Sequence, residues 1–174
     1  MSTSRNAKYW SHRAWGVERL YSVSRWLWVR NWRTASLAVK YLNTLLFRCY
    51  IDPAAQIGPR LDLPHGGFGV VISGSATIGS DAIIFHNVTI GNAKPGPITI
   101  GDRLYAGTGA TILGPIRIGN DVQIGANAVV VGADVPDGAT VVGPPSRVIA
   151  RQDNRPAANG TAQSGVSDES CVRQ

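Results

Sequence analysis

Two histidines, His65 and His86, are the side chains best suited to proton transfer. An imidazole can take a proton from a hydroxyl group near neutral pH and pass it to a leaving group. His65 stands two residues after Leu63, and His86 stands two residues after Ile84, so both follow an aliphatic residue at the same distance. They are the predicted catalytic residues. The alternative is a histidine that only caps a corner of the fold.

The elements that would position them follow from a six-residue repeat between residues 72 and 148. Aliphatic or small residues recur at every sixth position, apart from one ten-residue step, and these are Ile72, Ile78, Ile84, Ile90, Ile100, Ala106, Ile112, Ile118, Ile124 and Val130. A period of six fits neither the 3.6-residue turn of a helix nor the alternation of a plain strand. We therefore predict a β-solenoid of short strands and regular corners. At roughly eighteen residues per coil, residues 51–149 hold about five coils.

Counting coils places the two histidines on one face of the solenoid. Each follows the third repeat of its coil, so their Cα atoms should lie one layer apart, near the strand spacing of roughly 4.8 Å. Thr108 continues the same column in the next coil.

Composition divides the chain into three predicted parts. Residues 1–50 form a basic, Trp-rich helical segment, in which positions 1–49 carry nine Lys and Arg against Glu18 alone. Residues 51–151 form the solenoid, with a net charge of about −1. Residues 152–174 are polar and aperiodic, which is typical of a disordered tail. The basic character of the chain thus belongs to its leading segment.

The leading segment has two readings that remain open. Its helices would pack on the solenoid and support oligomerisation, or its Arg and Trp residues would dock on an anionic membrane surface. Nucleic-acid binding is the least favoured, and we expect none. Apolar runs are too short for a membrane span, and no signal-peptide layout is present, so a cytoplasmic setting is expected, with peripheral membrane contact as the variant. Cys49 and Cys171 suggest neither a disulfide framework nor a metal site.

Four motifs carry a resemblance to a known family. These are LPHGGFGVVI at 63–72, VTIG at 88–91, GTGATILG at 107–114 and GPPSRVI at 143–149. The chain resembles the hexapeptide-repeat acyltransferases, and within them the serine O-acetyltransferase-like branch. The resemblance implies a left-handed parallel β-helix, a homotrimer with active sites between neighbouring prisms, and acetyl transfer from acetyl-CoA. It also implies that His65 is catalytic.

Several positions depart from the pattern that the resemblance implies. Pro64 stands where those enzymes carry a serine-binding aspartate, and Tyr50 stands where a second aspartate orients the histidine. Asp52 and Asp62 are close enough in sequence to substitute for that second aspartate. The insertion at 92–99 has Gly96 where a further active-site histidine is implied. We therefore expect a saccharide or glycoconjugate hydroxyl as acceptor, as in short acetyltransferases of polysaccharide pathways. Serine as acceptor and a non-catalytic scaffold are the alternatives.

The departures also shape the predicted site. His86 would replace the missing histidine, and the predicted acceptor contacts are Asp62 and Lys94. Small residues in the C-terminal coils would let the pantetheine arm of acetyl-CoA lie along the prism edge, at Gly107, Gly109 and Ala126. Arg147 and Arg151 would meet the phosphates of CoA. The alternative for either arginine is a solvated surface charge.

Overall fold

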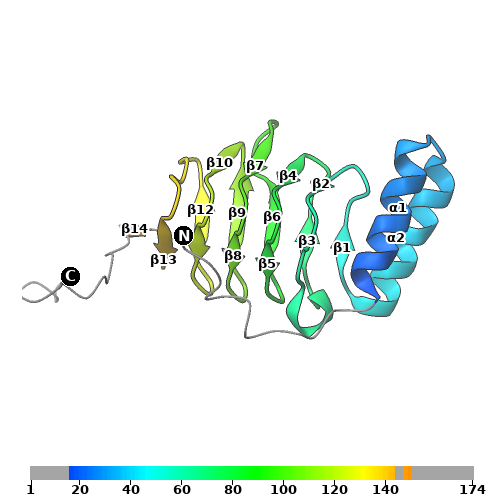
Figure 1. Ribbon diagram of the computed structural model, residues 1–174, viewed down its shortest axis with the longest axis horizontal. Coiled ribbons are helices and arrows are strands. Elements are labelled where there is room, and N and C mark those ends of the chain that lie inside the picture. The colour runs from blue at the N-terminus through cyan, green and yellow to red at the C-terminus, as the bar shows by residue number, and fades with distance from the viewer. Residues whose placement is uncertain (1–15, 144–146, 150–174) are drawn as a thin grey trace, which may run out of the picture.

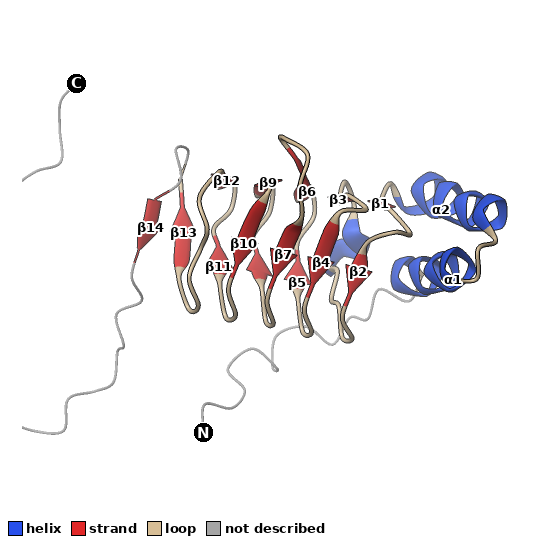
Figure 2. Ribbon diagram, turned by 90° about the horizontal axis from the view of Figure 1, so that it is seen from above, coloured by secondary structure: helices blue, strands red, loops and turns tan. Residues whose placement is uncertain are grey.

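The six-residue repeat folds into three flat sheets wound around one apolar core (Figure 1). The computed structural model describes residues 16–143 and the backbone of 147–149. Two helices, α1 (Val17–Val29) and α2 (Arg33–Phe47), precede the coils and lie side by side at one end of the solenoid (Figures 1 and 2). The prediction of a β-solenoid behind a helical segment is confirmed.

Each sheet collects one strand from successive coils. The first sheet contains β1 (Tyr50–Ile51), β3 (Val71–Ile72), β6 (Thr89–Asn92), β9 (Thr111–Gly114) and β12 (Val129–Val131). The second contains β2 (Gln56–Ile57), β4 (Ala76–Ile78), β7 (Ile98–Ile100) and β10 (Ile116–Ile118). The third contains β5 (Ile83–Ile84), β8 (Tyr105–Ala106), β11 (Gln123–Ile124), β13 (Thr140–Val142) and β14 (Arg147–Ile149).

The strand register matches the sequence repeat. Ile72 pairs with Ile90 and Ile90 with Ile112, so residues that lead successive coils stack directly inside the prism. These three side chains have no exposed surface. All strand pairs described are parallel except β13 with β14, which are antiparallel. The repeat therefore stops after β13, because the chain reverses there instead of adding another coil.

The first and last coils are incomplete. In the first coil a 3₁₀ segment, η1 (Pro64–Gly67), follows the single bridge between Asp62 and Ile83. In the last coil a single bridge joins Val135 to Ile118 where the second sheet would continue. The five layers on the first sheet thus amount to about four complete turns, slightly fewer than the repeat alone predicts.

Corner residues hold the coils in register. Asp121 and Asn127 adopt left-handed conformations, as their residue types predict, with φ of 57° and 55°. Asn120 instead uses its side-chain Oδ1 to accept the backbone N–H of Asp102 at 2.8 Å. At the same corner, Arg103 donates two hydrogen bonds to the carboxylate of Asp121 in the next coil, at 2.7 and 2.8 Å.

The helical pair is tied to the first coil by polar contacts. The Tyr21 hydroxyl donates to the carbonyl of Ala55 at 2.9 Å, and Arg25 donates to the carbonyl of Pro53 at 3.0 Å. Burial raises the pKa of Tyr21 to about 12. In the part of the chain that the structure describes, neither helix is long and apolar enough to cross a bilayer. The helices thus pack on the solenoid, as one of the two readings expects, and their support of oligomerisation stays a prediction.

Candidate active site

His65 and His86 lie side by side where the third sheet turns into the first. Their ring centroids are 5.1 Å apart and the rings are nearly perpendicular, at 84°. His65 belongs to η1 in the first coil, and His86 directly follows β5 and Phe85 in the second. The structure thus brings the two predicted histidines together, one coil apart, as the repeat register predicts.

A tight turn presents the His65 ring at this edge. Leu63 is fully buried in the core, whereas His65, two residues later, is exposed. The His65 backbone is left-handed, with φ 61° and ψ 26°, a conformation that few non-glycine residues adopt. Gly67 follows with φ 65°, and a Cβ there would lie 3.2 Å from the Cys49 sulfur. The three residues inserted into the repeat therefore form a compact projection that carries His65.

The next coil holds the backbone of His86 in place. Its backbone carbonyl accepts the N–H of Gly109 in the next coil at 3.1 Å. Its Nδ1 is buried and has no hydrogen-bond partner among the described residues. The Phe85 ring lies 6.3 Å from the His65 ring and 5.3 Å from the Tyr105 ring, measured between centroids. Sequence reasoning missed this aromatic row, which forms because the coils stack Phe85 beside Tyr105.

The predicted donor-binding positions continue the same edge. Gly107 and Gly109 lie between β8 and β9, one coil after His86, and Ala126 lies between β11 and β12, one coil further. The N–H of Gly107 donates to the carbonyl of Ile124 at 2.8 Å. A Cβ on Gly107 would lie 2.8 Å from the Ala126 nitrogen, so this glycine is also required for close stacking. The edge beyond the histidines is therefore lined by small residues.

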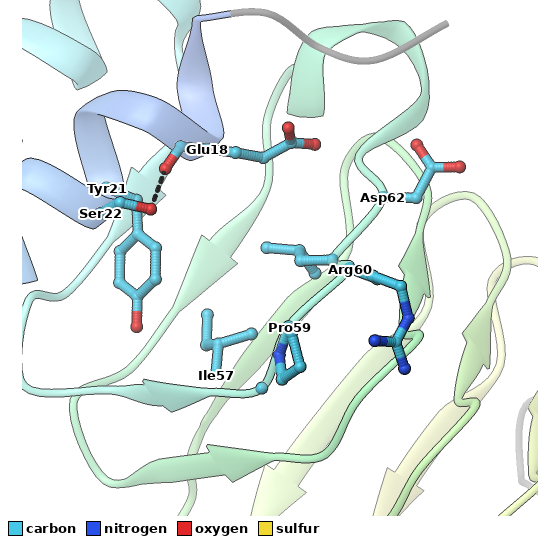
Figure 3. A pocket seen from close by; sticks show the side chains of 9 residues that line it. Glu18, Tyr21, Ser22, Ile57, Pro59, Arg60 and Asp62 are labelled. Atoms are coloured by element: carbon cyan, nitrogen blue, oxygen red, sulfur yellow. Dashed lines mark hydrogen bonds between the residues drawn. The ribbon is translucent and has the colours of Figure 1, made fainter. Parts of the chain in front are cut away.

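Asp62 lies at a cavity between α1 and the first coil. The cavity has a volume of about 490 Å³ and is lined by Glu18, Tyr21, Ser22, Ile57, Gly58, Pro59, Arg60, Leu61 and Asp62 (Figure 3). Burial raises the pKa of the Asp62 carboxyl above its usual value. Arg60 is engaged elsewhere, because it donates to both carboxylate oxygens of Asp81. Asp62 lines this cavity and lies three residues before His65, in the segment that leads into η1.

Lys94 is not brought to the histidines within one chain. It is exposed on the loop between β6 and β7, which is the opposite edge of the first sheet. The Asn92 side chain supports this loop by donating to the carbonyls of Lys94 at 3.3 Å and Gly96 at 2.5 Å. Sequence reasoning missed Asn92, although its place at the start of the insertion is a signal for a loop-supporting side chain.

The two predicted phosphate contacts lie at the margin of the structure. The backbone of Arg147 belongs to β14, and Arg151 lies outside the described residues. Within the described part of the chain, no three His, Cys, Asp or Glu residues gather to hold a metal ion.

No protein-family model matches the chain. Among curated relatives, the serine acetyltransferase of Mycobacterium tuberculosis is 42% identical over 150 residues, which cover 83% of this chain and 62% of that protein. The serine acetyltransferase of Helicobacter pylori is 39% identical over 136 residues, which cover 75% of this chain and 78% of that protein. The chain thus spans about three fifths of one relative and most of the other.

Solved structures of serine acetyltransferases also superpose on this chain. Serine acetyltransferase from Neisseria gonorrhoeae in complex with serine superposes with a TM-score of 0.71 at 35% identity, covering 75% of this chain and 54% of that one. A serine acetyltransferase in complex with CoA superposes with a TM-score of 0.72 at 32% identity, covering 76% and 55%. The same fold thus holds serine in one relative and CoA in another.

Stacked coils built from six-residue repeats, with a histidine pair at one edge, are the features of a hexapeptide-repeat acyltransferase. The relatives narrow the class, and this chain belongs to the serine acetyltransferase family. The expected polysaccharide branch finds no support, because the relatives and structures above are serine acetyltransferases. The LPHG motif, with Pro64 before the histidine, was too short a signal to assign the branch.

Proposed function

We propose that this chain is an acetyl-CoA-dependent O-acetyltransferase that transfers acetyl to the hydroxyl of serine. The observation that carries the proposal is the histidine pair, with rings 5.1 Å apart on an edge that continues into small residues. Membership of the serine acetyltransferase family supports serine as acceptor. The relatives solved with serine and with CoA support the two substrates.

His65 would act as the general base. Its imidazole takes the proton of the acceptor hydroxyl while the oxygen attacks the thioester carbonyl carbon. The tetrahedral intermediate then collapses and the carbon–sulfur bond breaks. The protonated imidazole returns its proton to the departing thiolate, so the products are free CoA and the O-acetyl ester. The exposed position of His65 leaves its ring accessible to an acceptor.

His86 would position the His65 ring. The edge-to-face contact restricts rotation of the His65 imidazole, and the fixed backbone of His86 holds that contact in place. His86→Gln should lower turnover and change its dependence on pH, while the melting temperature stays the same. Phe85→Leu is a matched control for loss of aromatic packing beside His65. A pH–rate profile unchanged in His86→Gln would assign His86 a purely structural role.

The donor would lie along the small-residue edge. Gly107, Gly109 and Ala126 leave room for the extended pantetheine arm, and Arg147 and Arg151 would pair with the phosphates. Asp62 would contact the acceptor from the segment before His65. Arg147→Gln and Arg151→Gln should raise the KM for acetyl-CoA with little change in kcat, which steady-state kinetics measures directly.

A homotrimer would complete this site. His65 and Ala126 are exposed in one chain, while Gly109 is half-buried and Gly107 is buried, and a site that excludes water needs a second wall at the exposed positions. Lys94 lies at the opposite edge of the first sheet, so only a neighbouring copy can bring it to a histidine pair. A three-fold arrangement of identical prisms would place one edge against the other in each cleft. Light scattering should give three times the chain mass, and a fully active monomer would contradict this assembly.

A donor and acceptor screen tests the function. Purified protein with acetyl-CoA and serine should release free thiol, and a panel of monosaccharides should not stimulate release. A saccharide hydroxyl is the second candidate, favoured by Pro64 at the place where the family resemblance implies a serine-binding aspartate. Thiol release with saccharides alone would select that candidate. No release with any acceptor would leave the scaffold alternative.

A further inference from the structure

The helical pair carries many of its large apolar side chains on the outside. Eight large apolar or aromatic side chains of the two helices and their connection are exposed, namely Val23, Trp26, Val29, Trp32, Tyr41, Leu42, Leu45 and Leu46. Leu45 is 74% exposed and Val29 is 69% exposed. The residues of each helix recur every three or four positions, so they form one strip along each helix. We call these eight residues the outer hairpin face.

Two arginines at the tip of the helical pair stack on tryptophans at or beside this face. The Arg30 guanidinium lies 4.0 Å from the ring centroid of Trp26, and that of Arg33 lies 3.6 Å from Trp28. Trp26 also contacts Trp32 edge to face, with centroids 6.4 Å apart. An Arg and Trp cluster therefore occupies the tip where α1 turns into α2. Trp combines an apolar ring with a polar N–H, which suits the boundary between lipid headgroups and acyl chains.

The charge of the segment selects the kind of partner. Residues 16–49 carry six basic side chains and one acidic side chain, Glu18. A second copy docked through the same face would bring two strongly basic surfaces together, and like charges oppose that contact. An anionic lipid surface has the opposite charge and also accepts apolar side chains.

We propose that the outer hairpin face docks on an anionic lipid surface. The Trp and Leu side chains enter the headgroup region, and Arg30 and Arg33 bind lipid phosphates. Because neither described helix can span a bilayer, the contact is peripheral. The helices lie at one end of the solenoid (Figures 1 and 2), so docking leaves the sides of the prism, with the histidine edge, open to solvent. This inference does not depend on the proposed acetyl transfer.

The tryptophans give this proposal a built-in probe. All five tryptophans lie in the first 32 residues, and Trp26, Trp28 and Trp32 belong to the helical pair and its connection, so intrinsic Trp emission reports on the leading segment and not on the solenoid. The full chain should be titrated with vesicles of phosphatidylcholine, with and without phosphatidylglycerol, at about 0.15 M salt. We expect a blue shift, and quenching by brominated acyl chains, only with the anionic vesicles. No shift with anionic vesicles, or an equal shift with neutral ones, would overturn the proposal.

Charge variants sharpen the test. Arg30→Gln with Arg33→Gln should weaken binding to the anionic vesicles roughly thirtyfold, because each basic residue near such a surface contributes about 1 kcal/mol. Lys94→Gln with Arg117→Gln removes the same charge from exposed sites on the solenoid and should change binding little. An equal loss of vesicle binding in both double variants would show that only the net charge of the chain matters. The proposal that the outer hairpin face is the docking site would then be wrong. If Leu45→Gln with Leu46→Gln instead halves the particle mass without lipid, a second copy covers the face and the proposal is wrong.

Discussion

The solenoid and the helical pair arrange polar and apolar side chains in opposite ways. Inside the solenoid the stacked positions are aliphatic, and Ile84, Ile90 and Ile112 have no exposed surface. Between the helices the buried positions include Ser24, Ser36, Lys40 and Asn43, while Leu45 and Leu46 face outward. The solenoid thus buries its stacked apolar positions within one chain, whereas the helical pair leaves large apolar side chains such as Leu45 exposed.

The difference has a structural cause in each region. Every coil of the solenoid repeats the same inward positions, so each added coil buries its apolar residues against the previous one. The two helices meet through small polar groups instead: the Ser24 hydroxyl donates to the carbonyl of Ser36 at 2.8 Å, and the Ser36 hydroxyl donates to that of Ser24 at 2.7 Å. The small serines let the helices approach closely, and beside them only Val17, Tyr21 and Leu27 of the larger apolar side chains in the helices are buried.

Core truncation should give the largest stability difference between the regions. Ile112→Ala removes a fully buried side chain from the middle coil and should destabilise the chain by about 2–5 kcal/mol. Leu45→Ala removes a side chain that is 74% exposed, so its effect should stay within about 0.5 kcal/mol. Chemical denaturation of both variants measures this contrast. A comparable loss in Leu45→Ala would show that the outer hairpin face is already covered within the protein.

Coil stacking should depend on specific glycines. A Cβ at Gly107 would lie 2.8 Å from the Ala126 nitrogen, so Gly107→Ala forces two coils apart and should cost about 1–3 kcal/mol. Gly91→Ala is the matched control on the same solenoid, because its Cβ would meet nothing closer than 3.9 Å. Thermal unfolding should separate the two variants. If the two variants have the same melting temperature, the coils tolerate more local movement than the structure indicates.

The stability of the chain should depend slightly on acidic pH through two carboxyl groups, Asp62 beside the helical pair and Asp81 on the solenoid. Burial raises the pKa of Asp62, so the folded chain holds this proton at pH values where the unfolded chain has lost it. The contribution of Asp62 to stability therefore falls as pH rises above its usual value of 3.8, and Asp62→Asn should remove this fall. Asp81 has the opposite sign, because Arg60 lowers its pKa and its contribution is lost as pH falls. Relative to the unmodified chain, the free energy of unfolding should rise more steeply with increasing pH across the acidic range in Asp62→Asn and less steeply in Asp81→Asn, and changes of the same sign would contradict the assigned pKa shifts.

The six-residue repeat of the sequence predicted the features of the structure that depend only on how the coils stack. The histidine pair could be placed because both residues stand at the same offset from a stacked aliphatic residue, and the coil register then fixes their separation. The faces of the helices could not be predicted, because Lys40 is buried, 6% exposed, through contacts with Tyr50 and Asp52 that only the fold creates. The left-handed backbone at Arg103 was missed for a similar reason, since the hydrogen bonds from its side chain to Asp121 form only between stacked coils.

The most direct test of the proposed acetyl transfer is the turnover of a His65 variant. His65→Asn is the suitable change, because asparagine tolerates the left-handed backbone at this position, where φ is 61°. With serine and acetyl-CoA as substrates, thiol release should fall by roughly 10² to 10⁴, the usual contribution of a positioned general base. The melting temperature should not change, because the side chain is exposed. A folded His65→Asn protein with the turnover of the unmodified chain would contradict the proposed mechanism.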